Sequence, residues 1–261
     1  MLRLAQAIFG IAAALFLILP IVAILPLAFT SSIFLSYPIP GYSLRWFSEL
    51  GEVAHWRNSI VNSLIIGSGA TALSVVLGTL AALALRGQGI PFPNLLRTVF
   101  LLPMVVPAVV LGVGLQISLA QIGLASSYLG VIFSHAVLCV PFVIVSVSTA
   151  LQGIDPTIER AAASLGASPT RVFRRVTMPL AMPGIVTGAV FAFATSLDEV
   201  VLTLFVAGPN QRTLARQMFS SIRENISPAV AAAALLLIVG TLLLALLAAY
   251  ARRRTAKTVE A

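Results

Sequence analysis

The chain has 261 residues, of which 59% are hydrophobic and only 9% are charged. Its mean hydropathy of +1.04 excludes an ordinary soluble domain and is typical of an all-α, polytopic membrane protein. The net charge of +8 does not indicate a nucleic-acid partner, because the basic residues lie in loops between apolar segments. A single cysteine, Cys139, excludes an internal disulfide and is expected to be a small packing residue.

Six apolar segments are long enough to cross a bilayer as helices of about 20 residues. They are expected at residues 7–29, 59–85, 98–120, 128–151, 180–206 and 228–250. Because no repeat, low-complexity tract or linker separates them, residues 1–261 are expected to form a single transmembrane domain. The first segment resembles a signal peptide, but its long apolar run without a clear cleavage site favours an uncleaved anchor.

Basic residues set the expected orientation. With a cytoplasmic N-terminus, eleven of the sixteen Lys and Arg residues fall on the inside and five on the outside. An excess of positive charge on the cytoplasmic side is the rule for membrane proteins. Both termini and the polar stretch 155–183 are therefore expected to be cytoplasmic.

That polar stretch is the longest in the chain, and its pattern predicts two short helices. Asp155 is suited to cap the first helix, with Pro156 at its first position. Gly166 is expected to end this helix in a left-handed conformation, and Ser168-Pro169 to start the second. Helical spacing places four apolar residues on one face of the first helix, namely Ile158, Ala161, Ala162 and Leu165.

The same stretch resembles the signature of the permease subunits of binding-protein-dependent ABC importers, roughly E-A-A-x-x-x-G-x9-I-x-L-P. The positions that match it or carry a similar residue are Ala161, Ala162, Gly166, Val176, Met178 and Pro179. One departure is Arg160 at the position of the signature's Glu, with Glu159 one residue earlier. This departure bears on the salt bridges of the unit rather than on docking itself.

The resemblance implies a type I ABC importer permease fold in a bacterial inner membrane, with six membrane helices and a cytoplasmic coupling unit at residues 155–179. In such a fold the coupling unit docks in a groove of an ATPase subunit. The residues expected to make this contact are Glu159, Arg160, Ala161, Ala162, Leu165, Gly166, Ser168, Pro169 and Phe173. The partners implied are a second permease subunit in a heterodimer, two ATPase subunits and a periplasmic solute-binding protein, within the lipid bilayer.

No residue pattern indicates catalysis in this chain. The P-loop motif is missing from the sequence, and the only lysine is Lys257 in the C-terminal tail. No spacing is typical of metal ligands or of a Ser/His/Asp triad. We therefore expect neither catalytic residues nor a metal or cofactor here, with ATP and Mg²⁺ bound by the partner ATPases.

Asp198 and Glu199 are the only acidic residues within an expected span. A charge at membrane depth is costly, so these carboxylates should face the bundle interior or water. Because adjacent helical positions point about 100° apart, one is expected to line the pathway and the other to contact a neighbouring helix. The alternative is that both form structural ion pairs. Other candidate pathway residues, which with the carboxylates suit an amine or another cation, are Phe191, Phe193, Thr195 and Ser196.

The segment 196–205, with the runs 208–209 and 226–228, closely resembles the permeases of the spermidine/putrescine group. This resemblance covers nearly all of the chain and implies a polyamine or a similar amine as the solute, although the group includes carriers of other small solutes. Two alternatives remain: an ion-coupled secondary transporter that uses Asp198 and Glu199, and a membrane scaffold without a pathway.

The expected outer loops hold a second candidate surface. Trp46 and Phe47 in the loop 30–58 favour an interfacial aromatic belt. Alternatively, this loop and residues 208–227 form a platform for the periplasmic binding protein, with Arg212 and Arg216 as further contacts.

Polar and helix-breaking residues also stand out within the spans. Asn62-Ser63 is expected to join helices, and His135 is expected to be an interhelical hydrogen-bond donor rather than a proton relay. In the span 98–120, Pro103, Pro107, Gly112 and Gly114 indicate either a packing kink or a position beside the pathway.

Overall fold

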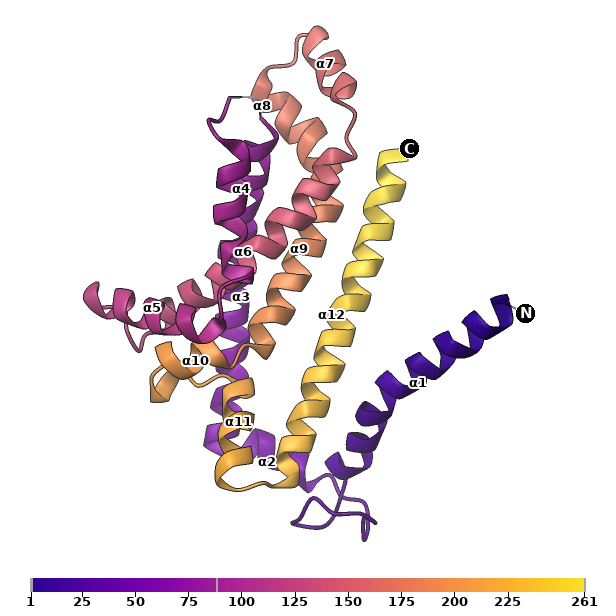
Figure 1. Cartoon of the computed structure of the whole chain (residues 1–261), viewed down its shortest axis with the longest axis vertical. Helices are drawn as coiled ribbons and strands as arrows, with labels where there is room; N and C mark the ends of the chain where they lie inside the picture. The colour runs from indigo at the N-terminus through magenta and orange to yellow at the C-terminus, as the bar shows by residue number, and fades with distance from the viewer. Residues whose placement is uncertain (1, 88, 261) are drawn as a thin grey trace. The chain divides into compact units, whose positions relative to one another are not determined.

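The structure is a computed structural model that describes residues 2–87 and 89–260, and the side chains of residues 3–87 and 89–250. Over these residues the chain is almost entirely helical, and its long helices confirm the all-α membrane class (Figure 1). Five of the described helices are long and apolar enough to cross a membrane, and a pair of helices bent by 99° forms either a sixth, broken span or a re-entrant loop.

The candidate crossings are α1 (Leu2–Ala28), α3 (Ala54–Arg86), the bent pair α4 (Pro93–Leu101) and α5 (Ala108–Gln121), α6 (Tyr128–Gln152), α9 (Met178–Asp198) and α12 (Pro228–Glu260). The shorter helices are α2 (Arg45–Glu52), α7 (Pro156–Ser164), α8 (Pro169–Val172), α10 (Val201–Val206) and α11 (Leu214–Glu224). These elements pack as two compact units. The first unit joins the N-terminal stretch up to Asn58 with Gln217–Gly240, and the second joins Ser59–Arg216 with the stretch from Thr241.

The core of the second unit is built where α9 lies directly against α6. A Cβ atom added to Gly184 would lie 2.5 Å from the Cβ of Ala150 and 2.7 Å from the carbonyl oxygen of Ser146. One turn further along α9, a Cβ atom on Gly188 would lie 3.0 Å from the Cα of Val143. This small-xxx-small pair allows the two helix backbones to approach closely, which is how helices associate in lipid.

The third expected span, 98–120, is bent rather than straight. α4 gives way to a single 3-10 turn at Leu102–Met104, and α5 begins only after Pro107. Proline lacks an N–H and disfavours the helical conformation in the residue before it, so Pro103 and Pro107 account for the bend. α5 then packs on α10, where a Cβ atom on Gly112 would lie 2.8 Å from the Phe205 ring.

The fifth expected span, 180–206, is interrupted, which corrects that prediction. α8 continues through one turn of π-helix, Phe173–Thr177, directly into α9, so a single helical run extends from Pro169 to Asp198. Glu199 then takes an extended conformation, and α10 begins as a separate helix. The run therefore starts earlier and ends earlier than its apolar composition predicts.

The close approach of α6 and α9 predicts opposite effects for two Gly→Ala substitutions. Gly184→Ala should lower the free energy of unfolding by about 1–3 kcal/mol, because the new methyl group overlaps Ala150 and a backbone carbonyl. Gly114→Ala in α5 is the matched control, since nothing lies within 4 Å of its added Cβ atom. Melting temperatures of the purified variants should fall for Gly184→Ala and hold or rise for Gly114→Ala; equal losses would contradict the packing.

Candidate functional site

The polar stretch forms the predicted pair of helices, and its helix ends confirm the capping pattern. The Asp155 carboxylate accepts the Thr157 N–H at 2.8 Å, and this hydrogen bond holds the pKa of that carboxyl below its usual value. At the other end Gly166 has φ +85°, with its N–H bonded to the Ala163 carbonyl. The Ala167 N–H bonds to the carbonyl of Ala162, which completes a Schellman motif and gives α7 a fixed end.

α8 begins at Pro169, as predicted. The Ser168 backbone carbonyl accepts the N–H groups of Arg171 and Val172, although the Ser168 side chain makes no capping hydrogen bond. The turn between α7 and α8 is therefore short and defined at both ends.

A single carboxylate ties α7 to two membrane helices. Oε1 of Glu159 lies 2.7 Å from a guanidinium nitrogen of Arg86, the last residue of α3, in an ion pair. The same oxygen accepts the Thr177 hydroxyl at 2.6 Å, just before α9. Partial burial raises the pKa of Glu159, but the hydrogen bonds from Thr177 and Arg86 and the Arg86 charge outweigh it, so the pKa is lowered.

The apolar face predicted for α7 is largely open. Leu165 is 89% exposed and Ile158 is 46% exposed, while Ala161 is also exposed. Ala162 and Phe173 are half-buried. The C-terminal end of α7 therefore presents an exposed apolar side chain, Leu165, on a helix that is capped at both ends and tied to its neighbours by Glu159.

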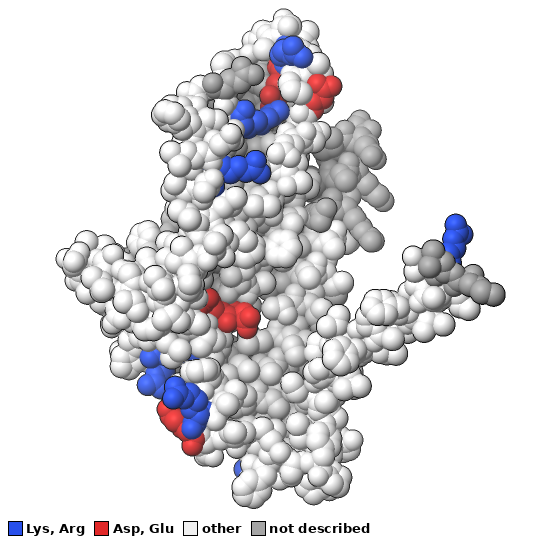
Figure 2. Space-filling view, in the orientation of Figure 1, with Lys and Arg blue, Asp and Glu red and all other residues white. Residues whose placement is uncertain are grey.

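The departure from the motif has a structural counterpart. Glu159, not the residue at the motif's Glu position, makes the ion pair with Arg86, and Arg160 is exposed. Figure 2 shows charged side chains at the end that carries α7 and α8, and acidic side chains again near the end of α9.

At the far end of the helical run, the two adjacent carboxylates have different surroundings. Oε1 of Glu199 accepts the Leu202 N–H at 2.7 Å and so caps α10. Asp198 is exposed and forms no hydrogen bond or ion pair with any residue that the structure describes. The backbone break between α9 and α10 thus gives the two carboxylates different surroundings, and which of them lines the pathway stays a prediction. Among the described residues, no three His, Cys, Asp or Glu side chains come together as a metal site.

His135 of α6 bridges this break from the side. Its Nδ1 lies 2.8 Å from the hydroxyl of Ser196, and its Nε2 lies 3.0 Å from the hydroxyl of Thr203. The Thr203 hydroxyl in turn donates to the Glu199 carbonyl. His135 is fully buried, and both ring nitrogens are used in contacts between helices, as predicted for an interhelical partner.

The other candidate pathway residues divide between two sides of α9. Ser196 is buried and hydrogen-bonded to His135. The half-buried Phe193 ring packs near Gly67 of α3. By helical periodicity, Phe191, Thr195 and Asp198 share another face. Phe191 is 53% exposed and stacks on the ring of Phe142 with centroids 6.5 Å apart. Of the candidate pathway residues on α9, the exposed ones are therefore Phe191 and Asp198, which lie on this face.

Asn62 and Ser63 fix a loop, a role that sequence reasoning missed. The Asn62 amide nitrogen donates to the carbonyls of Asn210 and Arg212 at 2.9 and 3.0 Å, and its oxygen accepts from Tyr128 at 2.7 Å. The Ser63 hydroxyl accepts the Leu214 N–H at 2.8 Å. Among the described hydrogen bonds of this pair, the one from Tyr128 joins it to another membrane helix, α6. No local sequence pattern predicted the contacts with the loop.

The residues predicted to dock a binding protein have varied surroundings. Arg216 is half-buried and donates to the carbonyls of Thr203 and Ala207 at the end of α10, whereas Arg212 is exposed. In the first unit, Trp46 is 4% exposed and its indole N–H donates to the Thr30 carbonyl at 2.8 Å. Phe47 is half-buried against Phe29. Docking stays a prediction, with Arg212 the one exposed member of the four.

Comparison with known proteins identifies related sequences. A family model described as "Binding-protein-dependent transport system inner membrane component" matches residues 74–257. The chain is 31% identical over 233 residues to the spermidine/putrescine transport system permease protein PotC of Escherichia coli K12, covering 88% of this chain and 87% of that protein. It is 34% identical over 202 residues to the putrescine transport system permease protein PotI of the same strain, covering 74% and 71%.

The fold also matches solved structures. A bacterial ABC transporter involved in the import of the acidic polysaccharide alginate aligns with a TM-score of 0.75 at 14% identity, covering 94% of each chain. At that identity the likeness concerns the fold alone, and it agrees with the predicted permease fold.

The Glu159 ion pair predicts a pH-dependent contribution to stability. Because the pKa of Glu159 is depressed in the folded protein, its contribution is present above the usual value of 4.5 and is lost as pH falls through the folded pKa. At neutral pH, Glu159→Gln and Arg86→Gln should each lower the free energy of unfolding by up to about 1 kcal/mol. The double variant should lose less than the sum.

Melting temperatures of the four proteins, measured at neutral pH and below pH 4.5, test this linkage. The difference between wild type and Glu159→Gln should shrink at the lower pH. Additive losses, or a difference that is independent of pH, would contradict the ion pair.

Proposed function

Because the chain belongs to the family of inner-membrane components of binding-protein-dependent transport systems, we propose that it forms half of a solute pathway driven by separate ATPase subunits. It is a multi-pass inner-membrane permease subunit. The second half of the pathway is a different permease chain, two ATPases bind at the cytoplasmic face, and a periplasmic protein delivers the solute. Both termini and α7 lie in the cytoplasm, in keeping with the distribution of Arg and Lys.

The exposed Leu165 is the observation that carries the coupling role. A leucine that is 89% exposed gains about 1.5–3 kcal/mol when it is buried fully in a partner. Its helix has defined ends at Asp155 and Gly166, and Glu159 ties it to Arg86 of α3 and to Thr177 just before α9. A partner that seats on α7 therefore moves the membrane helices with it. Phe173 and Pro169 complete the proposed docking unit.

Asp198 supports an amine as the solute. Two relatives from Escherichia coli are named for spermidine and putrescine, which are cations at neutral pH. An exposed carboxylate pairs with an ammonium group, and Phe191 on the same helical face offers an aromatic ring to it. We assign the solute to the polyamines or similar amines. An ion-coupled carrier is not favoured, because this family depends on a binding protein.

Substitution of Leu165 tests the coupling role. Leu165→Ser should weaken association with the ATPases by about ten- to a hundredfold, the loss expected when one buried leucine is removed. Leu165→Met keeps an apolar side chain of similar volume and should retain association. The measurement is co-purification of the ATPases from cells that express the whole transporter, with membrane insertion checked separately. Equal co-purification of both variants would argue against docking at α7.

Substitutions of Asp198 and Glu199, at the break between α9 and α10, test the proposal that the solute is an amine. Asp198→Asn should weaken putrescine uptake about tenfold or more, because the ammonium loses its charged partner, while the melting temperature stays unchanged. Glu199→Ala removes the cap of α10 and should lower the free energy of unfolding by about 1 kcal/mol. Normal putrescine uptake by Asp198→Asn would exclude Asp198 as the ligand and leave the coupling role untouched.

A further inference from the structure

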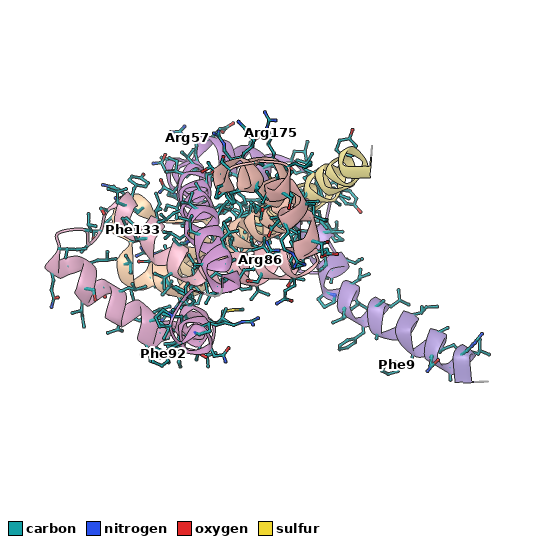
Figure 3. The ribbon with its side chains drawn as sticks, turned by 90° about the horizontal axis from the view of Figure 1, so that it is seen from above. Phe9, Arg57, Arg86, Phe92, Phe133 and Arg175 are labelled. Atoms are coloured by element: carbon teal, nitrogen blue, oxygen red, sulfur yellow. The ribbon has the colours of Figure 1, made fainter. Side chains whose placement is uncertain are left out.

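A basic pocket lies in the second unit, at the end that carries α7. It is formed by the last turns of α3 and α6 and the first turns of α4, and it has a volume of about 140 Å³. Its lining residues are Ala82, Leu85, Arg86, Pro93, Asn94, Arg97, Ser148, Leu151 and Gln152. In Figure 3, which views this end from above, Arg86 lies among the helices, and Phe92, which precedes α4, lies at the edge.

The polar lining suits an anion. Two of the nine lining residues are arginines and none is acidic. Arg97 is exposed and forms no hydrogen bond or ion pair with any described residue. Arg86 donates one hydrogen bond to Glu159 and has further N–H groups to donate, because a guanidinium has five N–H donors. Planar guanidinium groups bind phosphate oxygens well, and the Asn94 and Gln152 amides add neutral donors.

The size and position of the basic pocket limit the kinds of anion that it can bind. Sites for whole small molecules occupy about 300–1,000 Å³, so a volume of about 140 Å³ suits a single group such as a phosphate. Leu85 and Leu151 make part of the lining apolar. Arg86 ends the apolar helix α3, which places the pocket at the level where lipid headgroups meet the protein.

We propose that the basic pocket binds a phosphate group, held by Arg97 and by the free donors of Arg86. Two sources share this chemistry, the headgroup of an anionic phospholipid and phosphate in solution, and the apolar lining favours the lipid. This assignment is independent of the transported solute. It also places the bound anion on the same arginine that holds Glu159 of α7.

The test uses the full chain, purified and placed in nanodiscs of phosphatidylcholine with an equal amount of phosphatidylglycerol. Native mass spectrometry counts the lipids that each protein retains. Wild type should retain phosphatidylglycerol over phosphatidylcholine, and Arg97→Gln should bind it about tenfold more weakly. The control Arg171→Gln removes an exposed arginine of α8 outside the pocket and should behave as wild type.

A second arm separates the two sources of phosphate. Inorganic phosphate is titrated into the detergent-solubilised chain while its melting temperature is followed. Stabilisation of wild type but not of Arg97→Gln, without selective retention of phosphatidylglycerol, identifies phosphate from solution; the reverse pattern identifies the lipid. If Arg97→Gln matches wild type in both arms, the proposal is overturned.

Discussion

The rest of the second unit depends on a helical run that does not break between Pro169 and Asp198. Its 30 residues span about 45 Å, enough to connect the turn after α7 with the exposed carboxylate at its far end. The run is held along its length by α6, since Gly184 and Gly188 bring the two backbones together. Closely packed helices resist bending, so this contact stiffens the part of the run that lies against α6.

At the far end of this run, a side chain replaces a missing helical hydrogen bond. A break inside an apolar environment frees backbone groups that water cannot reach, and they must be satisfied internally. At the α9–α10 break, Glu199 accepts the Leu202 N–H. At the other end of α10, Arg216 donates to the carbonyls of Thr203 and Ala207. These contacts use Glu199 and Arg216 within the chain. They leave Asp198 as the carboxylate at the break that is open to a ligand.

Features set by neighbouring residues were predictable, and features set by distant ones were not. Asp155 and Gly166 act on their own helix, so their caps could be identified from the sequence. The end of α9 could not, because its apolar flanks have the composition of a continuous span, and the hydrogen bonds on either side of the break are made with His135 of another helix. Trp46 illustrates the same limit. An aromatic residue in a loop suggests a surface role, whereas the Trp46 indole is buried and donates a hydrogen bond to a carbonyl sixteen residues away.

The position of the acidic residue on α7 determines what a partner meets there. Because Glu159 is engaged by Arg86 and Thr177, its charge is already compensated within the chain. The surface left open at α7 includes the apolar side chains of Leu165 and Ile158 and the charged side chain of Arg160. For the docking proposed above, a complementary groove would combine an apolar pocket with acidic or neutral acceptors, since a basic residue opposite Arg160 would be repelled. The carboxylate one residue before the motif's Glu position thus contacts α3 and Thr177 within the chain, whereas Arg160 at that position is exposed.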